Sequence, residues 1–232
     1  GADPIHVRIV REAEGRRRPT VKIQTKDEFE WMDRSLADPV TWMLLPEKIV
    51  GYTSGDNETL SLPYLISRSG YADEVGRRAL YASAPHESAP DRRLMLIDYG
   101  TNLEVLVSNL LMGSELQRAA LLENAQLRDI HSFRCVIRFA HTAAPKALNP
   151  RKVGSTRKKI QLTSELEEYL DNLKRCATCY HVDAKTETYT FDFWINKASK
   201  TAFQSFWENA LNLYTTFHKF AMLNDLVISR DA

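Results

Sequence analysis

The sharpest chemical pattern in the sequence is the run 176–181, which reads CATCYH. Two thiolates spaced like Cys176 and Cys179 can share a metal ion, and the imidazole of His181 could add a nitrogen ligand. A tetrahedral structural site needs four ligands, however, and the sequence contains no second cysteine pair. Three interpretations therefore remain open: a metal site, a redox pair, or ordinary residues near a helix end.

A second pattern is a basic segment without acidic residues. Between residues 145 and 160, six positions carry a positive charge: Lys146, Arg151, Lys152, Arg157, Lys158 and Lys159. A smaller basic cluster lies upstream at Arg16, Arg17 and Arg18. Such clusters can neutralise the phosphates of a nucleic acid or of anionic lipids. A nuclear import signal and a solvated basic loop are the alternatives.

Motifs for common enzyme classes are absent. The sequence contains neither GxGxxG nor the GxxxxGK[ST] of phosphate-binding loops, and its histidines form no pair at i, i+4. Asp98, at the end of a predicted strand, could act as an acid or a base, although such aspartates usually form turns. We therefore favour binding over catalysis, while dispersed catalytic residues stay open, and we expect no cofactor.

Aromatic residues near the C-terminus suggest a docking surface. Phenylalanine, tyrosine and tryptophan recur at helical spacing after residue 200. Most of them should pack against a sheet. We expect Trp194 and Phe220 to stay exposed, because exposed apolar side chains often mark sites where a protein partner binds.

Composition points to an ordinary globular chain. The 232 residues are 44% hydrophobic and 26% charged, and the formal net charge is +1. Three cysteines suit a reducing compartment, which predicts an intracellular protein of the nucleus or cytoplasm. No apolar run approaches the ~20 residues that a membrane-spanning helix needs. The sequence does not predict the oligomeric state.

Local patterns predict mixed secondary structure. Alternation of apolar and polar residues predicts strands over 5–10 and 20–24, and a buried strand over 133–140. Thr25 and Glu28 match a capping box, which predicts a helix over 26–36, and Ser114 with Gln117 matches another. Segment 59–66 reads as extended and segment 103–107 as a strand, while 142–156 reads as a loop or linker.

The C-terminal part predicts a strand over 188–195 and then one long amphipathic helix over 203–221. A strand that leads into a final long helix resembles the pleckstrin-homology-like superfold, and this resemblance covers about the last 45 residues. Because many strand links look like turns, we expect an α+β fold of mainly antiparallel sheets with interspersed helices. We expect an N-terminal portion (1–90) and a C-terminal portion (91–232), or one single domain.

Three functions follow from these patterns. The first is a non-catalytic interaction module, an adaptor or scaffold, that binds a protein partner. The second is a nucleic-acid-binding protein that uses the basic segment 146–159. The third is a metal-binding or enzymatic site at Cys176, Cys179 and His181.

Overall fold

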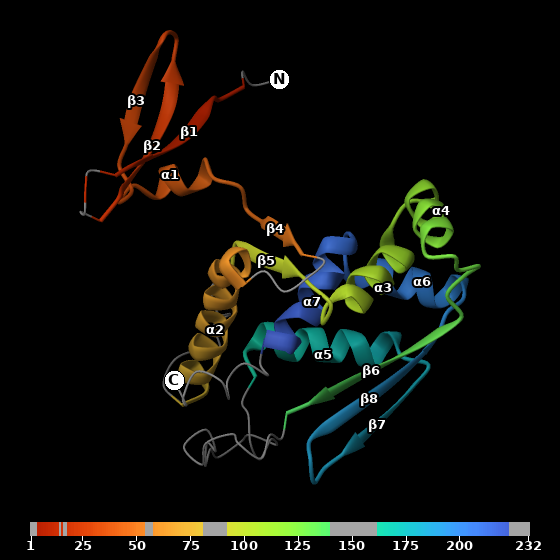
Figure 1. Cartoon of the computed structure of the whole chain (residues 1–232). Helices are drawn as coiled ribbons and strands as arrows, with labels where there is room; N and C mark the ends of the chain where they lie inside the picture. The colour runs from red at the N-terminus through yellow and green to blue at the C-terminus, as the bar shows by residue number, and fades with distance from the viewer. Residues whose placement is uncertain are drawn as a thin grey trace. The chain divides into compact units, whose positions relative to one another are not determined.

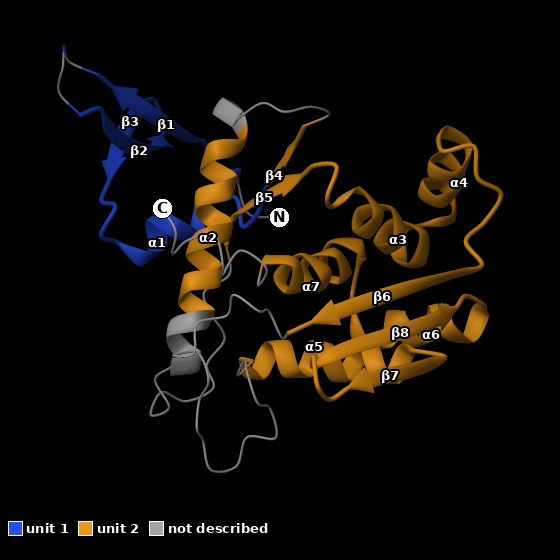
Figure 2. Cartoon of the chain, turned by 60° about the horizontal axis from the view of Figure 1, so that its bottom comes forward, with its two compact units in different colours: residues 1–49 blue, residues 50–232 orange. Residues whose placement is uncertain are grey.

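The chain folds into a mixed α+β structure, in agreement with the predicted fold class. The computed structural model describes residues 4–13, 15, 18–53, 58–80, 92–139 and 162–222, and within these it contains three small sheets (Figure 1). The chain divides into two compact units, unit 1 (Gly1–Ile49) and unit 2 (Val50–Ala232), as Figure 2 shows. This division falls between residues 49 and 50, and the expected portions 1–90 and 91–232, or one single domain, stay a prediction. The predicted loop 142–156 lies outside the described residues.

Unit 1 is built on a three-stranded antiparallel meander. Its strands β1 (Val7–Glu12), β2 (Thr20–Asp27) and β3 (Glu30–Arg34) pair in sequence order. A short helix, α1 (Pro39–Met43), follows them, and the side chain of Asp38 accepts a hydrogen bond from the Val40 amide at its start. Links of this length are too short for a helical crossover, so consecutive strands pair antiparallel.

The helix predicted over residues 26–36 is wrong, because this segment forms a hairpin of β2 and β3. Thr25 is a buried strand residue, and its hydroxyl accepts from Arg34 Nε at 2.7 Å instead of capping a helix. Glu28 adopts a φ of 43°, and Glu28 and Phe29 form the turn between the paired residues Asp27 and Glu30. The capping-box spacing was fulfilled, yet cross-strand pairing of the alternating residues prevailed.

The first part of unit 2 is largely helical. Strands β4 (Ile49–Tyr52) and β5 (Leu94–Ile97) form a two-stranded sheet. Helix α2 (Glu58–Leu80) connects the two strands, and α3 (Asn102–Met112) and α4 (Glu115–Asn124) follow β5. The predicted extended segment 59–66 and the predicted strand 103–107 are both helical, so both predictions are wrong. Apolar runs of this length fit a buried helix as well as a strand.

The second sheet of unit 2 carries its largest hydrophobic core. Strands β6 (Ser132–Arg138), β7 (Cys179–Asp183) and β8 (Thr188–Trp194) form an antiparallel sheet in the order β6-β8-β7. Helix α5 (Ser164–Cys176) packs against β8 and against the two C-terminal helices (Figure 1). The strands predicted over 133–140 and 188–195 are confirmed.

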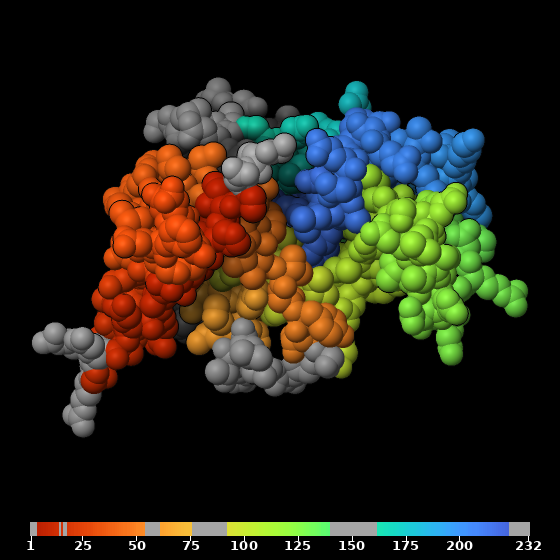
Figure 3. All heavy atoms as spheres, turned by 90° about the horizontal axis from the view of Figure 1, so that it is seen from above, coloured from red at the N-terminus to blue at the C-terminus, as the bar shows by residue number. Residues whose placement is uncertain are grey.

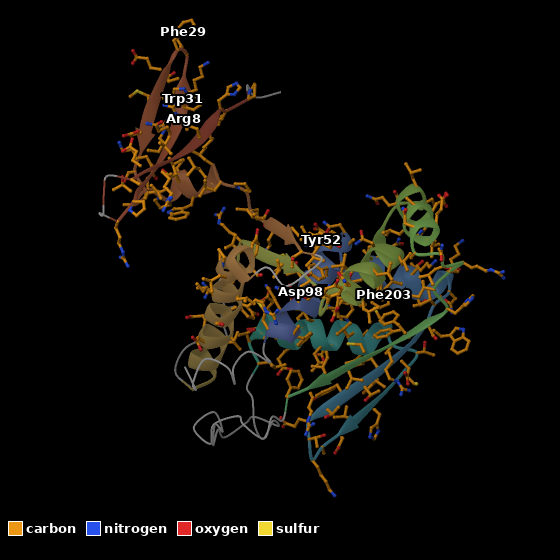
Figure 4. All side chains as sticks on the ribbon, viewed as in Figure 1. Arg8, Phe29, Trp31, Tyr52, Asp98 and Phe203 are labelled. Atoms are coloured by element: carbon orange, nitrogen blue, oxygen red, sulfur yellow. The ribbon has the colours of Figure 1, made fainter. Side chains whose placement is uncertain are left out.

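Alternation in β8 sends Tyr189, Phe191 and Phe193 into that core. Phe193 stacks on Phe133 with ring centroids 4.5 Å apart, and it contacts Phe203 at 5.3 Å. The label in Figure 4 places Phe203 among the side chains between the sheet and the helices. Because successive strand residues point to opposite faces, the intervening Thr190, Asp192 and Trp194 lie on the other face.

One long C-terminal helix is not found. Residues 197–222 form two helices, α6 (Lys197–Phe206) and α7 (Ala210–Met222). Trp207 adopts an extended conformation between them, is buried, and donates its indole N–H to Thr216 Oγ1 at 2.8 Å. This anchored indole holds the break in place, so the resemblance to the pleckstrin-homology-like superfold is not confirmed.

Candidate interaction surfaces

The structure separates the residues of the CATCYH run. Cys176 ends α5 and is buried, and burial raises the pKa of its thiol to about 12. Cys179 and His181 are exposed on β7, where their spacing places them on the same side of the strand. Among the described residues, no three His, Cys, Asp or Glu side chains are grouped so that they could hold a metal ion. The run therefore does not form a metal-binding group in the part of the chain described.

The predicted site residues Cys179 and His181 lie on the outer face of the β6-β8-β7 sheet, next to Arg134 and Asp192, neither of which was predicted as a site residue. The strand register aligns Arg134, Asp192 and Cys179 in one row. Arg134 Nε and Nη2 donate to the two carboxylate oxygens of Asp192 at 2.6 and 2.9 Å, and these bonds hold the pKa of Asp192 below its usual value. The Cys179 thiol donates to the same carboxylate at 3.8 Å. His181 lies in the adjacent row opposite Thr190.

Of the two aromatic side chains predicted to be exposed for docking, one is exposed and the other is buried. Trp194 lies at the end of β8 on this outer face and is 66% exposed. Phe220 is only 6% exposed and packs edge-on against Phe139 in the core. The expected exposure of Phe220 is wrong, because α7 turns this side chain toward the sheet.

Most of the predicted phosphate-binding residues cannot be placed. The basic segment 146–159 lies outside the described residues, as do Arg16 and Arg17. Arg18 is described and exposed. A nucleic-acid surface built from these residues stays a prediction.

Asp98 behaves as a turn residue. Its carboxylate accepts a hydrogen bond from the Gly100 amide at 2.9 Å and one from the Thr101 hydroxyl at 3.2 Å. These bonds shape the turn that leads from β5 into α3, where Figure 4 labels the side chain. A side chain already engaged in local bonds has a structural role, so nothing here favours Asp98 as a catalytic group.

Unit 1 carries a surface that the sequence reasoning missed. The pairing of Val7 with Thr25 and of Thr25 with Met32 defines one face of its sheet, which also carries Ile9, Val21 and Ile23. Phe29, at the tip of the hairpin, is 90% exposed (Figure 4), and Ile9 is 60% exposed. We call the exposed members of this set the apolar surface of unit 1: Ile9, Val21, Phe29 and Met32.

The opposite face of the same sheet is polar and internally bonded. Arg8 Nε donates to Gln24 Oε1 at 2.6 Å, and the Gln24 amide in turn donates to Asp33. The guanidinium of Arg8 also lies over the Trp31 ring, 4.2 Å from its centroid (Figure 4). One face therefore satisfies its polar groups with each other, while the other leaves large apolar side chains in contact with water.

The core of unit 1 is very small. Of its described residues, Ile23, Thr25 and Thr41 are the buried ones, and Ile23 is the sole large apolar side chain among them. The alternation of Val21, Ile23 and Thr25 was visible in the sequence. The predicted helix over 26–36 hid the partner strand, and without that strand the exposed face could not be recognised.

Comparison with known proteins does not assign the chain to a family. No family model matches it, and neither a curated protein nor a solved structure matches it. Within the described residues, no helix is both long and apolar enough to cross a membrane.

Proposed function

We propose that this chain is a non-catalytic interaction module that binds a protein partner through the apolar surface of unit 1. One observation carries the proposal: large apolar side chains are exposed around a unit that buries a single large apolar side chain. Contiguous exposed apolar side chains on a protein surface commonly mark a site of association. Because the opposite face of the sheet is polar and bonded within itself, we expect the partner to bind only on the apolar face.

The energetics of such a small unit support this proposal. A core in a segment shorter than ~70–80 residues rarely supplies more than ~3–5 kcal/mol of stability. Complete burial of one large apolar side chain contributes roughly 1.5–3 kcal/mol. A partner that covered Ile9, Val21 and Met32 would therefore stabilise unit 1 by an amount comparable to its own core.

The arrangement of side chains resembles a binding patch. Arg11 and Glu30 lie at opposite ends of this face, and Ile23 and Thr25 at its centre are already buried. The exposed Ile9, Val21 and Met32 flank this buried pair, so a partner would extend the small core outward and meet polar groups at the rim, as is common in interfaces. Phe29 extends beyond the sheet at the hairpin tip, and aromatic side chains of this kind often anchor an interface in a pocket of the partner. The complementary surface is expected to offer such an apolar pocket.

Site-specific photocrosslinking tests the proposal in the full chain. Phe29 is replaced by the photoreactive p-benzoylphenylalanine, and the matched control carries the same group at Leu116. Leu116 is 82% exposed on α4, a helix that has no buried residues. The part of the chain that contains α4 is green in Figure 3. We expect adducts with another protein at position 29 to exceed those at position 116 several-fold.

Two results would contradict the proposal. Equal adduct yields at positions 29 and 116 would show that the apolar surface has no preference for a partner. An adduct that contains two copies of this chain, in place of a different protein, would show that the surface mediates self-association.

A further inference from the structure

A groove in unit 2 lies between α5 and α6, away from the sheet face that carries Cys179. Its volume is about 760 Å³, within the range of ~300–1,000 Å³ that is common for ligand sites. Its lining is polar and charged, except for one aromatic ring: Glu168, Asp171, Asn172, Lys174, Arg175, Ser205 and Phe206. Such a lining suits a ligand with hydrogen-bonding and charged groups better than a purely apolar one.

Two of the four charges in the groove neutralise each other. Lys174 Nζ forms an ion pair with Asp171 Oδ1 at 2.6 Å. Glu168 and Arg175 are exposed, and neither forms an ion pair within the described part of the chain. The groove therefore presents one available negative charge and one available positive charge to an occupant.

The Phe206 ring positions the Arg175 guanidinium, which can bind an anion. The guanidinium lies over this ring, 5.4 Å from the centroid. Stacking of this kind holds the planar group while its N–H donors stay directed at solvent, and the guanidinium fork matches the geometry of a carboxylate. Less side-chain entropy is then lost when a carboxylate binds.

The spacing of the two charges suggests the chemistry of the occupant. Glu168 and Arg175 are seven residues apart on one helix, which corresponds to about 10 Å along its axis. In a polyproline II segment, residues three apart lie on the same side and are separated by about 9 Å. A basic and an acidic side chain at such positions would meet Glu168 and Arg175 together.

The groups between the two charges also suit a peptide. Asn172 lies one turn from Glu168 and is buried, so its amide lies at the base of the groove. The Ser205 hydroxyl donates to the Thr201 carbonyl at 2.9 Å and keeps its acceptor capacity. A peptide backbone in the polyproline II conformation has no internal hydrogen bonds, so its amides and carbonyls are free to bond with such groups.

We propose that the groove between α5 and α6 binds an extended peptide segment that carries a basic side chain and, three residues away, an acidic one. Arg175 binds the acidic side chain and Glu168 the basic one. This site is separate from the apolar surface of unit 1 and does not depend on it.

Fluorescence anisotropy with labelled peptides tests the proposal on the full chain. The probes are Lys-Pro-Pro-Glu and Glu-Pro-Pro-Lys, because the direction of the segment is not fixed, together with Gln-Pro-Pro-Gln; each carries a neutral label at its N-terminus and an amidated C-terminus, so that only side chains are charged. One charged probe should bind, and Arg175→Gln or Glu168→Gln should each weaken its binding about twofold to fivefold, as expected for loss of one exposed ion pair. Arg128→Gln, an exposed arginine outside the groove, should leave binding unchanged.

The charge-exchanged variant Glu168→Arg/Arg175→Glu provides a positive test. It should bind the charged probe of opposite order, while the native chain prefers the first. The proposal is overturned if no charged probe binds, if the uncharged peptide binds equally well, or if Arg175→Gln has no effect. Both positions are exposed, and circular dichroism of each variant verifies that the fold is retained.

Discussion

Among single residues, Lys219 is a charged side chain that is almost completely buried. It is 2% exposed, and its Nζ forms an ion pair with Glu165 Oε1 at 2.5 Å, which joins α7 to α5. The Tyr169 hydroxyl donates to the same carboxylate oxygen at 3.0 Å. A buried charge is tolerated only when it is paired, because its desolvation costs several kcal/mol. The sequence around Lys219 does not reveal this partner, because Glu165 lies 54 residues away along the chain.

We predict that Lys219→Met lowers the free energy of unfolding by about 3–5 kcal/mol, because it removes a buried cation and leaves the partly buried Glu165 without its counter-charge. The matched control is Lys174→Met, which removes the more exposed ion pair that the half-buried Lys174 forms with the exposed Asp171 within α5, and which should cost less than about 1 kcal/mol. Denaturant unfolding of both variants measures the difference. Equal losses in the two variants would contradict the assigned role of the buried pair.

The three cysteines should differ sharply in reactivity. Burial raises the pKa of Cys135 and of Cys176 to about 12, while Cys179 is exposed. At pH 8, iodoacetamide should therefore label Cys179 alone in the folded chain and all three residues in denaturant, as counted by mass spectrometry. The Cys179→Ser variant should lose the rapid labelling. Fast labelling of Cys135 or Cys176 in the native chain would show that these thiols are not buried.

The raised pKa values of Cys135 and Cys176 make the free energy of unfolding depend on pH. A thiol with a raised pKa in the folded state favours folding while it is protonated. Its contribution is complete below the unfolded value of 9.0 and is lost as the pH rises toward about 12. The free energy of unfolding should therefore fall above pH 9, and the fall should be smaller in Cys176→Ala. A stability that stays constant from pH 9 to 11 would contradict this account.

Among the elements, the β2-β3 hairpin depends on an unfavourable turn residue. Glu28 adopts a φ of 43°, a conformation that costs a side-chain-bearing residue roughly 1–2 kcal/mol and that glycine accepts freely. Glu28→Gly should therefore slow hydrogen exchange of the hairpin amides. The control Glu30→Gly, in a strand two residues away, should accelerate it, because glycine weakens a strand interior. Acceleration by Glu28→Gly would contradict the turn geometry.

Which elements could be predicted depended on how local their cause was. The alternation in β8 and the capping box of Ser114 with Gln117 are properties of a few neighbouring residues, and both are confirmed. The hairpin after Thr25 and the break at Trp207 depend on contacts that form only when the chain folds back on itself: a paired strand and the hydroxyl of Thr216, nine residues after Trp207. Local patterns cannot report such contacts, so a helix was predicted in the first case and an uninterrupted helix in the second.

Across the chain, the same limit explains which candidate site residues were found. Exposure of Trp194 follows from strand alternation, and the sequence anticipated it. The apolar surface of unit 1 could not be anticipated, because Ile9, Val21 and Met32 share a face only once three strands are in register. The α5–α6 groove likewise needs the packing of α5 against α6, which two strands separate in the sequence.

The central claim is that unit 1 binds a protein partner through its apolar surface. The most direct measurement compares two double variants of the full chain in quantitative affinity capture: Phe29→Ser/Met32→Ser in unit 1, and Leu103→Ser/Leu116→Ser, which removes two comparably exposed leucines from unit 2. We predict that the first variant loses at least 90% of a specifically bound partner, about a tenfold change or 1.4 kcal/mol, while the second retains it. Equal retention by the two variants, or loss in the second alone, would contradict the claim.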